Sequence, residues 1–304
     1  MTGLHTTSQL RVPPTWAWGL GVFLTALAAF GFRLAAEPPF VDEWAYISQS
    51  FYADKLLQPN DPAWLEYPAY DLPPLTKNLV GAALKLAGYR PPPPAAARAW
   101  YANTHATFGP PAMLWVARRP VVVFGALGCV AVFALGTLAV DRWVGLVAAG
   151  LLMLDPLYRM LSRRAMSDIP AEALLLAASA VGLLGLRGLL RSQWGLARGL
   201  LAFVLAGLLA GLATLSKLHG VLGLIVVLAW LGLAMLLPRC SWRLCSILAG
   251  VGAAAGVTAF LLFAALNPFL TAHPTGPLPS GMASWRGSRC RGAAGSWSGT
   301  GWRF

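Results

Sequence analysis

Charged residues are scarce in this sequence. Asp, Glu, Lys and Arg make up 11% of its 304 residues, against about 25% in a typical soluble domain. Apolar residues make up 57%. So little charge cannot coat the water-facing surface of two soluble domains, and this composition also excludes disorder, collagen and a disulfide scaffold. We therefore predict an all-α polytopic membrane protein, whose solvent is mostly lipid.

Cysteine and acidic residues are also few. The four cysteines are scattered, without the spacing of a zinc site or a disulfide framework. The 11 acids stand against 23 basic residues, which gives a net charge of +12. No basic, aromatic-interleaved polar domain is present to bind nucleic acid, so we predict no nucleic-acid partner. In a membrane protein such positive charge more often reflects loop orientation and anionic lipid headgroups.

The sequence contains many long apolar runs. A membrane-spanning helix needs about 20 mostly apolar residues. We predict seven spans, at 12–32, 120–140, 143–160, 169–190, two within 199–238, and 244–266. The run 199–238 turns at Lys217–Gly220, because a single helix of that length would measure about 60 Å, roughly twice the hydrocarbon core. The first span is too long for a signal-peptide core, although cleavage near Ala35–Ala36 stays an alternative.

A loop of residues 37–118 separates the first two spans. Apolar residues recur at helical spacing within 42–57, and Asp71 with the prolines after it resembles a helix start. We therefore expect two amphipathic helices on the membrane surface. Residues 276–304, by contrast, are rich in Gly, Ser, Arg and Trp, and predict an irregular tail behind a transmembrane module of residues 1–275. The tail looks like the product of a truncated or frame-shifted reading frame.

The loops alternate between the two sides of the membrane. One side receives Arg11, Arg142, Arg187, Arg191, Arg198, Arg239 and Arg243 against a single acid, Asp141. We expect this side to be cytoplasmic. The other side receives 37–118, 159–168, Lys217–His219 and 267–304. It would face the exterior of a plasma or inner membrane, or the lumen of an internal one. The three arginines of 159–168 oppose the orientation bias, and a phosphate ligand would explain them.

Several segments resemble one enzyme family. Phe40–Tyr46, which contains Asp42-Glu43, is similar to the Asp-Glu motif of the GT-C membrane glycosyltransferases, and specifically of the protein O-mannosyltransferase and aminoarabinose-transferase family (glycosyltransferase family 39). Asp71–Lys77 resembles that family's Pro-Pro-Leu segment, although many members have His in place of Asp71. Arg164–Pro170 resembles a second acidic motif, and Leu215–Gly220 and Asn267-Pro268 also look like family segments. The resemblance covers about residues 15–275, and since members usually continue through further spans, the chain looks like an N-terminal module.

The resemblance implies that a sugar moves from a polyprenyl-phosphate donor to a hydroxyl of a protein, lipid or glycan acceptor at the lipid bilayer, with inversion. A carboxylate can take the hydroxyl proton, and cations can stabilise the leaving phosphate. The catalytic residues it implies are Asp42 as base, Glu43 and Asp168. The substrate-binding residues it implies are Lys77, Arg163, Arg164, Lys217 and His219. No cofactor is implied with certainty; a divalent metal stays open, although no ligand spacing demands one.

Simpler interpretations compete with these roles. Asp42 could be only a helix N-cap, Arg164 and Asp168 an ordinary i,i+4 ion pair, Lys217 a snorkelling side chain and His219 a turn residue. Two other functions also stay open. A transporter would need charged or broken spans at mid-membrane in repeated halves, whereas most polar groups here lie at span ends. An inactive, truncated fragment could still fold as a membrane scaffold.

Overall fold

The computed structural model describes residues 14–58, 60–237 and 241–267. Six of its helical segments are long and apolar enough to cross a membrane: Thr15–Ala36, Pro111–Ala139, Asp168–Leu190, Leu196–Ser216, Leu218–Met235 and Trp242–Leu266. They contain α1 (Thr15–Gly31), α6 (Pro111–Ala139), α9 (Asp168–Leu190), α10 (Leu196–Ser216), α11 (Leu222–Met235) and α12 (Trp242–Leu266). The predicted all-α polytopic membrane fold is confirmed. The predicted tail, 276–304, lies outside the described residues.

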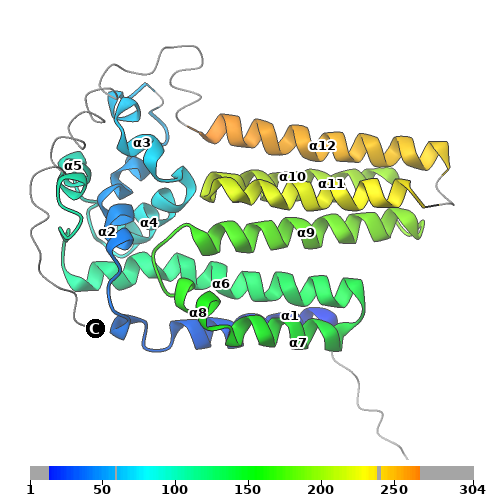
Figure 1. Cartoon of the computed structure of the whole chain (residues 1–304), viewed down its shortest axis with the longest axis horizontal. Helices are drawn as coiled ribbons and strands as arrows, with labels where there is room; N and C mark the ends of the chain where they lie inside the picture. The colour runs from blue at the N-terminus through cyan, green and yellow to red at the C-terminus, as the bar shows by residue number, and fades with distance from the viewer. Residues whose placement is uncertain (1–13, 59, 238–240, 268–304) are drawn as a thin grey trace, which may run out of the picture.

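The third predicted span is interrupted. It consists of α7 (Arg142–Leu154) and the short α8 (Pro156–Leu161). Asp155 caps α8 by accepting a hydrogen bond from the Tyr158 N–H at 2.7 Å, and Pro156 cannot continue α7 because it has no N–H and its ring is too bulky. At about 1.5 Å per residue, α7 alone is shorter than the hydrocarbon core. The chain therefore returns along α6 in two pieces rather than one (Figure 1).

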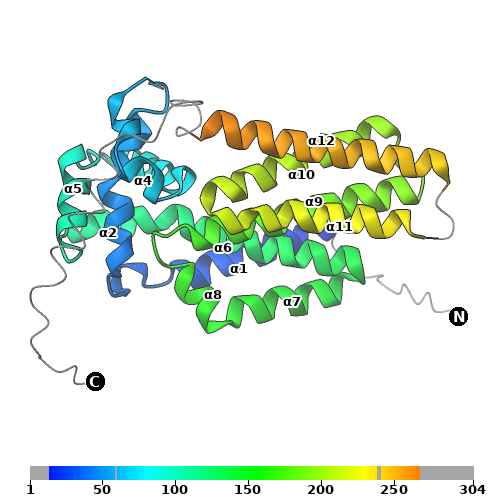
Figure 2. The same cartoon turned by 45° about the horizontal axis from the view of Figure 1, so that its top comes forward.

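The long helices lie side by side as a bundle, and shorter helices gather at one end of it (Figures 1 and 2). These are α2 (Val41–Ser48), α3 (Pro68–Asp71), α4 (Pro74–Leu86) and α5 (Pro94–Ala102). The start of α9 and the ends of α10 and α12 lie at the same end. The described parts of the loops that were predicted on one side of the membrane therefore lie at one end of the bundle.

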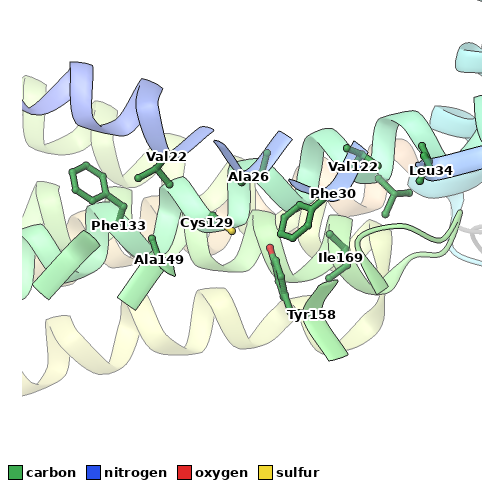
Figure 3. Close-up of a cluster of buried hydrophobic side chains, with 12 residues drawn as sticks. Val22, Ala26, Phe30, Leu34, Val122, Cys129, Phe133, Ala149, Tyr158 and Ile169 are labelled. Carbon is green, nitrogen blue, oxygen red and sulfur yellow. The ribbon is translucent and has the colours of Figure 1, made fainter. Parts of the chain in front are cut away.

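Small residues set the spacing of the bundle. Figure 3 shows the apolar cluster between α1, α6, α7 and α8, in which Phe30 and Tyr158 lie beside Cys129. The Tyr158 hydroxyl donates to the Gly125 carbonyl at 3.0 Å, and a Cβ on Gly128 would lie 2.0 Å from that hydroxyl. Glycines thus let helices of a membrane bundle approach closely, as is usual where apolar surface alone does not drive association.

The surface helix α4 packs tightly into the end cluster. Val80 and Leu84 are fully buried, and a Cβ on Gly81 would come within 2.3 Å of the Ser50 carbonyl oxygen. The opposite face carries Leu86, which is 91% exposed. One side of α4 therefore belongs to the protein core, while the exposed Leu86 suits the membrane surface on which the helix was expected to lie.

Candidate active site

A cavity of about 550 Å³ lies where the short helices meet the bundle. Four charged side chains line it, from four separate parts of the chain: Asp42 of α2, Asp71 of α3, Asp168 of α9 and Lys217 after α10. Its other polar residues are Tyr46, Ser167, Thr214 and Asn267, and its apolar wall includes Leu72, Trp100, Met166, Leu218 and Phe263. Polar and charged groups thus converge beside an apolar wall, to which α5 contributes Trp100 and α12 contributes Phe263.

Asp42 stands in the first turn of α2 but does not cap it. The N-cap residue is Phe40, whose backbone N–H donates to Glu43 Oε2 at 2.9 Å. The Asp42 carboxylate is left to line the cavity, so the simple N-cap interpretation does not hold. Burial raises the pKa of Asp42, the negative charges of Asp168 and Asp71 raise it further, and Lys217 opposes them. A raised pKa makes this carboxylate a better proton acceptor.

Asp168 and Lys217 form an ion pair in the cavity lining. Lys217 Nζ lies 2.6 Å from Asp168 Oδ1, and the side chains stay 43% and 27% exposed. Lys217 has extended backbone between α10 and the 3₁₀ turn Leu218–Val221. The turn approaches α10 so closely that a Cβ on Gly220 would lie 2.2 Å from the Ala213 carbonyl carbon. The close packing of this turn fixes the lysine beside the start of α9.

The expected pairing of Asp168 with Arg164 is replaced by this ion pair. Helix α9 begins at Asp168, so Arg164 lies in the turn before it and the helical i,i+4 geometry is absent. The Arg164 guanidinium instead lies 4.5 Å from the centre of the Phe40 ring. Arg164 does not line the cavity.

Glu43 is fully buried and lies outside the cavity lining. Its two carboxylate oxygens accept from Arg118 Nε and Nη2, each at 2.7 Å. Glu43 Oε1 also accepts from the Ala165 N–H at 2.8 Å. This one carboxylate therefore ties α2 to α6 and to the segment before α9, and so holds Asp42 and Asp168 relative to each other.

Arg163 and Lys77 also make interior contacts instead of lining the cavity. Arg163 Nε donates to Glu37 Oε2 at 2.8 Å, and its Nη1 donates to the carbonyl of Phe32 at 2.7 Å. Lys77 Nζ donates to the carbonyls of Pro68 and Ala69 at 2.9 and 2.7 Å. Burial lowers the pKa of Lys77 to about 7, although Asp71 opposes the shift.

His219 lies in the 3₁₀ turn after Lys217 and outside the cavity lining. Of the eight residues predicted for the site, Asp42, Asp168 and Lys217 are thus the three that meet at the cavity.

Asp71 and its tyrosine partners were not among the predicted site residues. Tyr67 donates its hydroxyl proton to Asp71 Oδ1 at 2.8 Å, and the Tyr101 hydroxyl binds the other oxygen. Gln49 Nε2 donates to the Tyr101 oxygen at 2.9 Å. Burial and the hydrogen bond to Asp71 raise the pKa of Tyr101. This network joins α5 to α3 at the cavity rim; Asp71 was visible in the Pro-Pro segment, but no motif marked Tyr101.

No group of three or more His, Cys, Asp or Glu side chains suited to a metal ion occurs within the described ranges. The carboxylates and the ammonium group at the cavity can do general-base chemistry and electrostatic stabilisation. Both groups face a space large enough for a sugar-sized molecule.

Comparison with known proteins places the chain in a family. A family model described as dolichyl-phosphate-mannose-protein mannosyltransferase matches residues 65–265, which is 201 of the 304 residues. The chain belongs to this family. The match contains three of the four charged cavity residues of this mannosyltransferase family member, namely Asp71, Asp168 and Lys217, and begins after Asp42. No curated protein matches the chain.

Proposed function

We propose that the protein transfers a sugar from a polyprenyl-phosphate donor to an acceptor hydroxyl in the cavity of Asp42, Asp168 and Lys217. The observation that carries the proposal is the convergence of these three side chains on one cavity beside an apolar wall. The family description supplies the donor class, and a protein hydroxyl is the acceptor that it favours.

In the proposed reaction the acceptor oxygen attacks the anomeric carbon while its proton passes to the Asp42 carboxylate. The bond between that carbon and the phosphate oxygen breaks, and its electron pair leaves with the polyprenyl phosphate. The single displacement inverts the anomeric configuration. Lys217, oriented by Asp168 at 2.6 Å, stabilises the negative charge that grows on the phosphate.

The apolar side of the cavity suits the donor's lipid tail. Leu218 lies in the 3₁₀ turn that follows α10, and Phe263 lies near the end of α12. A polyprenyl chain entering between these helices would bring its phosphate to Lys217. The arginine-rich opposite end of the bundle would face the cytoplasm, so the cavity would face the exterior or a lumen.

The proposal is tested with the full chain reconstituted in liposomes that contain polyprenyl-phosphate mannose, with a serine- and threonine-containing peptide as acceptor. Mass spectrometry of the peptide is expected to show added hexose. A folded chain that yields no glycosylated peptide, lipid or glycan would contradict the proposal, and sugar flux without any product would instead support a transporter.

Lys217→Gln is expected to lower the turnover number by about 10²-fold, because one preorganised donor to a developing anion contributes on this order. The effect should fall mainly on kcat, since the phosphate charge grows as the bond breaks. Lys85→Gln is the matched control: Lys85 pairs with Asp54 on the surface, away from the cavity. Equal rates for the two variants would remove Lys217 from the proposed role.

The acid limb of the pH–rate profile should move in opposite directions in two variants. Transfer needs ionised Asp42, so activity falls as the pH drops through its pKa, which burial raises above the ordinary 3.8. Asp168→Asn removes a neighbouring negative charge, so the limb should shift to lower pH. Lys217→Gln removes the opposing positive charge, so the limb should shift to higher pH. If the acid limbs of both variants coincided with that of the wild-type protein, Asp42 would be excluded as the titrating base.

A further inference from the structure

A second hollow lies at the opposite end of the bundle from the candidate active site. Its volume is about 230 Å³, and it lies between the end of α6 and the connection from α9 to α10. Its polar lining is Thr137, Arg187, Arg191, Gln193 and Trp194. We call it the arginine pocket. None of its residues belongs to the proposed transfer chemistry.

Two guanidinium groups in the arginine pocket have no counter-ion among the described residues. Arg187 and Arg191 are one helical turn apart at the end of α9, where like charges repel. Neither guanidinium group has an ion-pair or hydrogen-bond partner in the described part of the chain. A helix C-terminus favours a nearby cation, but that does not account for two arginines around a hollow. An anion between the two guanidinium groups would offset their repulsion and accept hydrogen bonds from both.

The wall of the pocket is held in place by a defined turn. Ser192 has a positive φ of 53°, and the N–H groups of Gln193 and Trp194 both donate to the Gly188 carbonyl, at 3.1 and 3.2 Å. The Trp194 indole covers Gly188, where a Cβ would lie 2.5 Å from the ring. The hollow is therefore preformed, with an indole of the kind that lies at membrane interfaces.

The charge around the pocket identifies the kind of ligand. Arginines at this end of the bundle include Arg142, Arg187, Arg191, Arg198 and Arg243. Asp141 is the one acid there within the described ranges, and its carboxylate already accepts from the N–H groups of Trp143 and Val144. This excess of positive charge lies where a span ends, at the depth of lipid headgroups, and basic hollows between spans bind anionic headgroups.

From this arrangement we propose that the arginine pocket binds the phosphate of an anionic phospholipid headgroup. Arg187, which is partly buried, and Arg191, which is exposed, grip the phosphate oxygens. Gln193 and Thr137 offer further hydrogen bonds, and Trp194 covers the glycerol side of the headgroup. The lipid thereby braces α9 against α6 at the end of the bundle away from the cavity.

The test uses the purified full chain in nanodiscs of neutral phosphatidylcholine, or of the same lipid with added phosphatidylglycerol. Retained lipids are counted by native mass spectrometry, and unfolding is followed on heating. Wild-type protein should retain phosphatidylglycerol and unfold at a higher temperature in its presence. Arg187→Gln/Arg191→Gln should bind it roughly tenfold more weakly or worse, because it loses charge-assisted hydrogen bonds.

The matched control is Arg198→Gln/Arg243→Gln, which removes the same charge at the same end of the bundle but outside the pocket. It should keep wild-type retention. Equal loss in both double variants would show diffuse attraction to the anionic surface and overturn the proposal. Inorganic phosphate, added at the same concentration to neutral nanodiscs, should give no shift; a full shift would assign the pocket to a free phosphate. Arg191→Gln alone, at an exposed position, repeats the test if the double variant does not fold.

Discussion

Asp42→Asn is expected to lower sugar transfer by about 10²- to 10⁴-fold, the usual contribution of a general base. The amide has the size of the carboxylate but cannot accept the hydroxyl proton. Asp42 forms no hydrogen bond that caps α2, since Phe40 and Glu43 fill that role, so the helix should persist. The measurement is single-turnover transfer from polyprenyl-phosphate mannose to a hydroxyl peptide, which isolates chemistry from product release.

Asp54→Asn is the matched control for this variant. Asp54 stands on the neighbouring 3₁₀ turn, pairs with Lys85 on the surface and lies outside the cavity. Its transfer rate should equal the wild-type rate. Binding of the donor, measured separately, should survive in both variants, because Lys217 and the apolar wall remain. If Asp42→Asn turned over as fast as the wild-type protein, Asp42 would not be the base, although the protein would still be a sugar transferase.

The membrane fold was predictable because its rule is simple. The backbone of each membrane-spanning helix must make its hydrogen bonds within the helix, and the side chains that face lipid must be apolar. Six of the seven predicted spans could therefore be found from composition and length alone. The division at Lys217–Gly220 followed from helix length and the cost of a mid-membrane charge. Asp155-Pro156 was also visible in the sequence and was expected near the end of the third span, whereas in the structure it separates α7 from α8.

The candidate site was predictable only in part, for a different reason. Span alternation brings Asp42, Asp168 and Lys217 to one end of the bundle, and these three meet at the cavity. The alternation of spans does not predict which charged side chains form ion pairs with each other. Glu43 and Arg118 are 75 residues apart in the sequence, and their ion pair depends on how α2 packs against α6. The sequence alone therefore does not distinguish the buried, ion-paired Glu43 from the neighbouring Asp42, which lines the cavity and is our proposed base.

The Arg118–Glu43 pair gives the largest expected effect on stability. Arg118→Met should lower the free energy of unfolding by about 3–5 kcal/mol, because it leaves a fully buried carboxylate without its counter-ion. It also frees the carbonyls of Leu34, Glu37 and Pro38, to which the guanidinium donates. The measurement is reversible unfolding of the full chain in mixed micelles, with increasing denaturing detergent.

Two comparison variants show whether the unpaired charge is the cause. Arg119→Met changes the neighbouring, exposed arginine, whose guanidinium lies 4.0 Å from the Trp115 ring, and should cost no more than about 1 kcal/mol. Glu43→Gln/Arg118→Met removes both charges and should recover part of the loss, since a buried charge without a partner costs more than a neutral pair. Equal stability of Arg118→Met and Arg119→Met would show that the pair is not what holds α2 on α6. In that case another contact must keep Asp42 at the cavity.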